Sequence, residues 1–183
     1  LPTSGFMPEV PSKKPFSGGM KFQNNDVLLA RITPCLENGK TCLINLLEQD
    51  EIGFGSTEYI VMRGKESSIP CFIAQLSRSD SFRHFAISKM TGTSGRKRLK
   101  AESLEGYTLA IPSTDLLSQY EMLFQSYFDM MSSNTIQNQE LASLRDWLLP
   151  MLMNGQVTVG DAEEKVAAYT SSSSVSVAAE GEE

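Results

Sequence analysis

The stretch DVLLARITPCLENGKTCLI, residues 26–44, decides how the first part of the chain folds. Residues 26–32 form a mostly apolar run with the length and composition of a buried strand. A polar turn, Glu-Asn-Gly-Lys at residues 37–40, separates this run from a second apolar run at residues 41–44. Strand, glycine-containing turn and strand in this order predict a hairpin-like pair.

The segments on either side of this pair indicate an α+β domain. Residues 1–20 are dense in Pro, Gly and Ser and are expected to form a loop. Residues 53–57 predict a Gly-rich bend that leads into a strand at residues 58–63. Apolar residues at helical spacing predict one or two short helices over residues 71–90, and a last strand is expected at residues 104–111.

The 183 residues are expected to form three parts. The first, residues 1–112, is a domain with a mixed or antiparallel sheet, which Pro112 closes. The second, residues 113–157, is a long helix that would extend roughly 55 Å at its usual rise per residue. The third, residues 158–183, is acidic, rich in Ser and without apolar periodicity, which predicts disorder.

Apolar residues of the long helix repeat at alternating steps of four and three, the a/d pattern of a coiled coil. The seam consists of Leu116, Tyr120, Leu123, Tyr127, Met130, Asn134, Gln137, Leu141, Leu144, Leu148 and Met151. Its polar members, Asn134 and Gln137, cost stability but can fix register or the choice of partner. Because one helix cannot bury such a stripe alone, we expect a coiled coil with a partner helix. The predicted pairing residues are Leu116, Tyr120, Leu123, Tyr127, Met130, Leu141, Leu144 and Leu148.

Charge is distributed unevenly along the chain, whose formal net charge is -6. Residues 1–112 hold 14 Lys and Arg against 11 Asp and Glu, whereas residues 113–183 hold 2 against 11. Residues 82–101 contain six Lys or Arg and no acidic residue. The first part is therefore suited to a phosphate backbone, although a solvated basic face is the alternative.

Three segments supply side chains that we expect to contact double-stranded DNA. The basic loop after residue 90 combines cations, hydroxyls and glycines, a mixture suited to phosphate contacts and to recognition of guanine by arginine. The turn region at residues 31–40 and the Gly-rich bend add further donors and acceptors, although simple turn chemistry is the alternative for any one of them. The predicted DNA-binding residues are Arg31, Thr33, Asn38, Lys40, Ser56, Thr57, Thr91, Thr93, Ser94, Arg96, Lys97, Arg98 and Lys100.

No catalytic residue is predicted in this chain. Gly39-Lys40-Thr41 ends like a phosphate-binding P-loop, but Pro34 stands where that pattern requires glycine. Gly53-Phe54-Gly55 begins like a dinucleotide-binding fingerprint, but Glu58 replaces the final glycine. Cys35 and His84, the only histidine, could be imagined as a nucleophile and base, but a packing or surface role explains this histidine better.

Composition also argues against a metal site and an oxidising or membrane environment. The three cysteines are odd in number and lack CxxC spacing, so neither a disulfide framework nor a metal site is expected. No apolar run approaches the roughly 20 residues that cross a bilayer, and the first residues do not resemble a secretory signal. We therefore expect a cytoplasmic protein with no membrane partner.

Four segments resemble type I restriction-modification specificity subunits. They are residues 26–41, residues 53–58, residues 90–96 (MTGTSGR) and residues 144–156 (LRDWLLPMLMNGQ). Over about residues 15–157 the chain looks like the carboxy-terminal target recognition domain of such a subunit and the conserved helix that follows it. The order and spacing of these segments make a chance agreement improbable.

The resemblance implies a DNA-recognition chain that reads one half of a bipartite site and is not itself an enzyme. In that family the specificity subunit docks modification subunits, which use S-adenosylmethionine, and restriction subunits join the complex with ATP and Mg. The resemblance implies no cofactor in this chain. It also implies that the long helix forms an antiparallel coiled coil with a second helix, from another copy or from the missing half. Two alternatives stay open: a coiled-coil interaction module without specific DNA binding, and a fragment of a methyltransferase with a fused recognition domain.

Overall fold

The structure is a computed structural model that describes residues 1, 6–8, 13–65, 69–93, 95–164 and 167. The chain divides into two compact units, Leu1–Ile136 and Gln137–Glu183. Within the described residues, the first unit contains all the strands, two short α-helices and a 3-10 helix, together with the beginning of the long helix.

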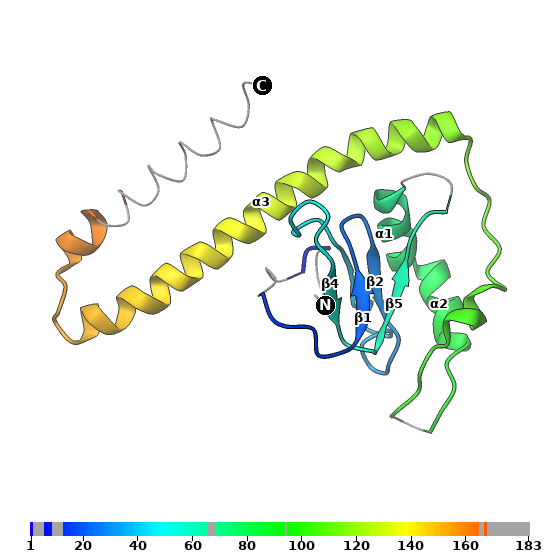
Figure 1. Cartoon of the computed structure of the whole chain (residues 1–183), viewed down its shortest axis with the longest axis horizontal. Helices are drawn as coiled ribbons and strands as arrows, with labels where there is room; N and C mark the ends of the chain where they lie inside the picture. Colours follow the sequence, from blue (N-terminus) through cyan, green and yellow to red (C-terminus); the bar gives the residue numbers. More distant parts are fainter. Residues whose placement is uncertain (2–5, 9–12, 66–68, 94, 165–166, 168–183) are drawn as a thin grey trace. The chain divides into compact units, whose positions relative to one another are not determined.

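Antiparallel strands form two small sheets in the first unit (Figure 1). Strand β2 (Val27–Ala30) lies between β3 (Thr41–Leu43) and β5 (Tyr59–Met62), and it is antiparallel to both. The hairpin-like pair predicted for residues 26–44 is therefore confirmed. Strands β1 (Met20–Phe22) and β4 (Gly53–Gly55) pair with each other in the second sheet.

Two sequence predictions about strands are wrong. The Gly-rich segment predicted to bend forms β4, because the absence of side chains at Gly53 and Gly55 leaves room for the Phe22 ring of the paired strand. The strand predicted at residues 104–111 does not form. Instead a 3-10 helix, η1 (Ala101–Leu104), is followed by an irregular segment in which Ile111 is 73% exposed. A strand needs a neighbour to satisfy its backbone groups, and this segment has none among the described strands.

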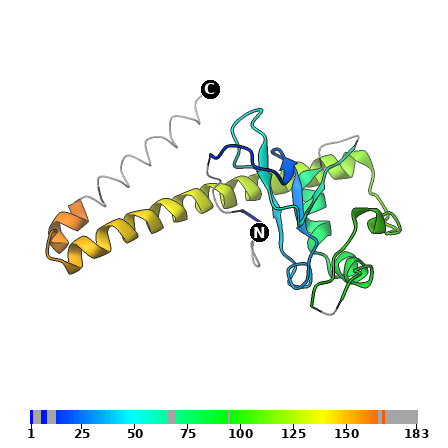
Figure 2. The same cartoon turned by 60° about the horizontal axis from the view of Figure 1, so that its bottom comes forward.

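Both faces of the three-stranded sheet are covered, which explains why β2 is apolar along its whole length. Side chains alternate between the faces. Val27 and Leu29 point to the face covered by helices, where α1 (Pro70–Arg78) and α2 (Asp80–Ser88) contribute to the core (Figures 1 and 2). Leu28 points to the other face and packs near Phe22 of β1.

The long helix α3 extends from Thr114 to Met153, which confirms the predicted helix. Its first half packs on the domain through a stripe that the sequence prediction did not select. Leu117 and Phe128 of this stripe are buried, and Phe124 and Met131 are partly buried. The Phe128 ring makes an edge contact with Phe6, with the ring centroids 5.3 Å apart. The stripe starts one residue after the predicted seam and has the same four-three spacing.

A glutamate of α3 also caps α1. Helix α1 begins at Pro70, which has no backbone N–H, and its N-cap residue Ile69 has no side-chain acceptor. The Glu121 carboxylate accepts hydrogen bonds from the backbone N–H groups of Cys71 at 3.0 Å and Phe72 at 2.8 Å. These are donors that the first turn of an α-helix leaves without an internal partner. One side chain of α3 therefore completes the amino end of α1.

The second unit contains the end of α3 and part of the predicted disordered tail. Residues 159–164 are helical rather than irregular. Their helix begins with a reciprocal cap, in which the Thr158 N–H and hydroxyl donate to the Asp161 carboxylate and the Asp161 N–H donates to Thr158. The Thr-x-x-Asp pattern is the signal in the sequence that this prediction missed. Most of the remaining predicted tail lies outside the described residues.

Candidate nucleic-acid interface

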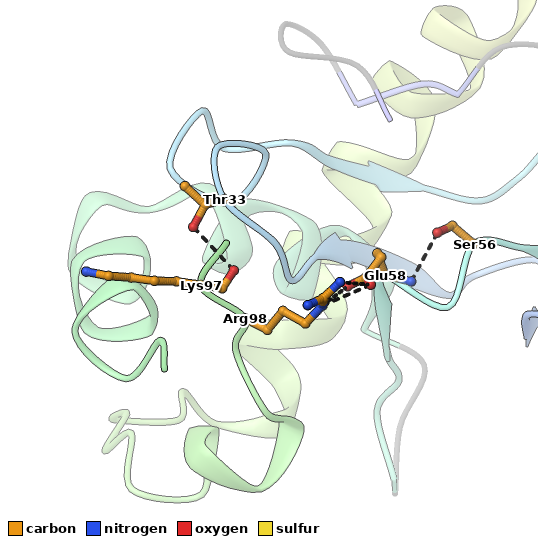
Figure 3. A network of polar contacts seen from close by, with 5 residues as sticks. All are labelled: Thr33, Ser56, Glu58, Lys97 and Arg98. Carbon is orange, nitrogen blue, oxygen red and sulfur yellow. Dashed lines mark hydrogen bonds and ion pairs between the residues drawn. The ribbon is translucent and has the colours of Figure 1, made fainter. Parts of the chain in front are cut away.

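The segments predicted to bind DNA adjoin one another in the first unit (Figure 3). Arg31 links two of them, because its N–H donates to the Glu58 carbonyl at 3.0 Å and its own carbonyl accepts from the Leu99 N–H at 2.8 Å. Thr33 donates to the Lys97 carbonyl through both its N–H, at 3.0 Å, and its hydroxyl, at 3.3 Å. We refer to residues 31–40, 56–58 and 91–100 together as the loop cluster.

Buried leucines anchor two parts of the loop cluster. Leu36 in the first segment and Leu99 in the third are almost completely buried in the same core as Leu29 of β2 and Phe82 of α2. Each segment thus places one apolar side chain inside the domain while its polar neighbours face outward. These anchors restrict the positions of the exposed residues on either side of them.

The third segment is a narrow loop closed by paired backbone bonds. The Thr91 N–H donates to the Arg98 carbonyl at 3.0 Å, and the Arg98 N–H donates to the Thr91 carbonyl at 2.8 Å. Gly92 has a φ of +130°, and a side chain on it would meet the Arg96 carbonyl oxygen at 2.8 Å. Glycine is therefore required at this position for the loop to close.

Most of the predicted DNA-binding residues are exposed to solvent. Those described as exposed are Asn38, Ser56, Thr57, Thr91, Thr93, Arg96, Lys97, Arg98 and Lys100, whereas Arg31, Thr33 and Lys40 are half-buried. Ser94 lies outside the described residues. The Lys97 side chain extends away from the pair formed by Glu58 and Arg98 (Figure 3). The exposed cations and hydroxyls of the loop cluster can therefore reach an external ligand.

One acidic residue of the loop cluster was not among the predicted contacts. The Glu58 carboxylate accepts from Arg98 Nε at 3.0 Å to each oxygen, and Arg98 Nη2 lies 2.9 Å from Glu58 Oε1. The hydrogen bond from Arg98, together with the charges of Arg98 and Arg31, lowers the pKa of Glu58 below its usual value. The Glu58 N–H donates to Ser56 Oγ at 3.1 Å. Sequence alone could not find this pair, since 40 positions separate its members.

The predicted helix-pairing residues have different surroundings. Leu116, Leu123, Tyr127, Met130 and Leu141 are exposed, as the pairing prediction requires of side chains available to a partner. Tyr120 instead packs within the domain, where its ring stacks on Phe124 at 4.3 Å. In the second unit Leu144 is half-buried and Leu148 is buried. The exposed members in the first half of α3 are therefore the ones most accessible to a second helix.

The cysteines offer little nucleophilic chemistry. Cys42 and Cys71 are buried, and burial raises the pKa of each thiol to about 12. Cys35 is half-buried, and His84 is exposed on α2. Within the described residues there is no group of three His, Cys, Asp or Glu side chains that could hold a metal ion. No helix among them is long and apolar enough to span a bilayer.

Comparison with known proteins finds relatives in the family that the sequence resembles. No protein-family model matches the chain. It is 32% identical over 129 residues to the type I restriction enzyme EcoAI specificity subunit of Escherichia coli, covering 69% of this chain and 21% of that subunit. The chain is related to type I restriction specificity subunits. The EcoEI specificity subunit of the same organism is 30% identical over 128 residues, with the same coverage.

The relationship confirms the resemblance found in the sequence. The type I specificity subunits that match are much longer than this chain. The matched region is about a fifth of their length. The chain therefore corresponds to one segment of such a subunit, and the activity of a whole specificity subunit is not established for it. The observed antiparallel sheets and the long helix agree with the predicted α+β fold.

Proposed function

We propose that this chain is the sequence-specific DNA-recognition part of a type I restriction-modification complex and that it reads one half of a bipartite site. The observation that carries the proposal is the loop cluster, in which segments far apart in the sequence present Arg96, Lys97 and Lys100 beside Arg31. Phosphate contacts would give affinity and register, and arginine contacts to base edges would give specificity. The specificity-subunit relatives support a role in recognition.

In this proposal the chain performs no chemistry. It would dock modification subunits, and through them restriction subunits, while S-adenosylmethionine, ATP and Mg would be bound by those partners. The exposed seam of α3 would pair with a second helix, from another copy or from the rest of a longer subunit, and would set the distance between two half-sites. Neither a cofactor nor a membrane partner is proposed for this chain.

A salt-dependent binding assay tests the proposal. Replacing Arg96, Lys97, Arg98 and Lys100 with Ala should weaken binding to duplex DNA and reduce the slope of log K against log salt concentration by nearly one for each phosphate that the variant no longer neutralises. The matched control replaces Lys13, Lys14, Lys21 and Lys65, which are exposed and lie outside the loop cluster. If both variants bind like each other, net charge rather than the loop cluster is responsible.

The same assay addresses the alternatives. An interaction module without specific DNA binding is the better description if the wild-type chain shows no salt-dependent affinity for DNA but still associates through α3. Binding of S-adenosylmethionine by the isolated chain would instead favour a methyltransferase fragment. Among the described residues of the loop cluster, none specifically favours either alternative.

A further inference from the structure

Glu58 has a position in the loop cluster that its charge does not explain. A carboxylate on a surface that faces phosphates opposes binding, because like charges repel. Glu58 nevertheless lies between the two arginines that the sequence analysis selected as DNA contacts. Its carbonyl accepts from the Arg31 N–H, and its carboxylate accepts from Arg98.

The geometry of the pair fixes the orientation of Arg98. Two different nitrogens of the guanidinium, Nε and Nη2, meet the Glu58 carboxylate at 2.9 to 3.0 Å, so the plane of the group cannot turn freely. The carboxylate occupies the side edge of the guanidinium. The adjacent edge, formed by Nη1 and the second N–H of Nη2, is left to make paired hydrogen bonds to N7 and O6 of guanine.

The backbone that carries the Glu58 carboxylate is itself fixed by hydrogen bonds. The backbone of Glu58 is bound on both sides, through its N–H to Ser56 Oγ (Figure 3) and through its carbonyl to the Arg31 N–H. The side chain of Arg98 is 49% exposed and that of Glu58 is 30% exposed. The backbones of both members of the pair are thus fixed, since Arg98 is bound to Thr91, while about half of the Arg98 side chain stays exposed. This is the arrangement expected for an oriented contact residue.

We propose that Glu58 is a positioning residue that holds the Arg98 guanidinium in the orientation from which it reads a base. The inference rests on the proposed DNA-recognition function and adds to it a residue that determines specificity. Holding the long side chain in place beforehand reduces the conformational entropy lost on binding. It also favours the base that matches the fixed fork over bases that would require another orientation.

The experiment compares sequence discrimination in variants of the full chain. Wild-type protein is first used to select a preferred sequence from a randomised duplex library. Affinity is then measured for that duplex and for a scrambled duplex of equal length and composition. The variants are Glu58→Gln, Glu58→Ala, Arg98→Ala and the double variant Glu58→Gln with Arg98→Ala. Glu37→Gln is the matched control, because Glu37 is an exposed carboxylate of the loop cluster that takes no part in the Arg98 pair.

Glu58→Gln should lower the ratio of the two affinities by about tenfold, within the range for removal of one paired base contact, and Glu58→Ala should lower it at least as far. Affinity for the scrambled duplex should not fall, because a negative charge has been removed. Glu37→Gln should strengthen binding to both duplexes alike and leave their ratio unchanged. In the Arg98→Ala background the Glu58 substitution should have no further effect on the ratio.

Two results would overturn the inference while leaving the proposed function intact: an unchanged ratio in Glu58→Gln, or the same reduction with and without Arg98. If the wild-type chain does not discriminate between the duplexes at any salt concentration, both the inference and the proposed function fail. Circular dichroism and thermal melting of each variant check that the fold is preserved, which is expected because the pair lies at the surface.

Discussion

The contact between α3 and the amino end of α1 should be a major determinant of the stability of the first unit. Glu121 supplies the acceptor for two backbone N–H groups, on Cys71 and Phe72, and Cys71 is completely buried. Glu121→Ala would leave both donors without this partner. A hydrogen bond to a charged group contributes about 1.5 to 3 kcal/mol.

Because Glu121 is only partly buried, water can replace part of this stabilisation, and the lower end of that range applies to each bond. We therefore expect Glu121→Ala to reduce the free energy of unfolding by about 2 to 4 kcal/mol. Glu121→Gln keeps one oxygen acceptor but loses the charge that favours a helix amino end, so it should cost about half as much. Glu140→Ala, at an exposed position of the same helix, should change the free energy by less than about 0.5 kcal/mol.

Urea unfolding followed by circular dichroism measures these differences, and amide exchange at Cys71 and Phe72 reports the two donors directly. Exchange at both amides should accelerate in Glu121→Ala. The reasoning is refuted if Glu121→Ala unfolds at the same urea concentration as Glu140→Ala, or if the exchange of both amides is unaffected.

Three further predictions concern association, thiol reactivity and catalysis. Replacing Leu116, Leu123 and Met130 with Asp should abolish association through the exposed seam, whereas Asp at the exposed polar positions Gln119, Ser126 and Ser133 should not. Sedimentation at tens of micromolar (~10 to 50 µM) tests this, and a monomeric wild type would contradict pairing with another copy. At about pH 8 the native protein should be alkylated at Cys35 but not at Cys42 or Cys71, since burial raises the pKa of these two thiols to about 12 and few thiolates form. Mass spectrometry locates the label, and equal labelling of all three would show that the core opens. The purified chain should neither cleave nor methylate DNA with S-adenosylmethionine, ATP and Mg present, and methyl transfer by it alone would disprove the proposed role.

Predictions from local sequence patterns were correct where the predicted strand also has a neighbouring strand from another part of the chain. The run at residues 26–32 and the turn after it specify a hairpin, and the structure contains it. The apolar residues at 104–111 have a comparable local pattern, but none of the described strands lies beside them, and Tyr107 packs instead against Phe82 and Phe85. Strand formation depends on that neighbour, which a local pattern does not reveal.

In the candidate site, too, local sequence predicted the character of each segment but not the contacts between segments. Residue types and Gly-rich loops indicated which segments of the loop cluster would be polar, basic and exposed. They did not indicate that Glu58 and Arg98 would pair, or that Leu36 and Leu99 would anchor the loops, because both depend on contacts between distant segments. The DNA contacts selected from the sequence therefore stay predictions that binding experiments must test.

The helix α3 explains why a heptad pattern alone could not identify its partner surface. Two stripes one residue apart have the same four-three spacing, and the domain covers the one that contains Leu117 and Phe128. The adjacent stripe, with Leu123 and Tyr127, is left exposed. One residue corresponds to about 100° around a helix. The packing of the covered stripe on the domain would therefore set the direction in which the exposed stripe faces a partner helix. In the proposed complex, loosening that attachment should therefore alter the tolerated spacing between half-sites without altering base preference. Disrupting the pair of Glu58 and Arg98 should alter base preference without altering the tolerated spacing. Comparing the two kinds of variant would therefore separate base recognition from control of the spacing between half-sites.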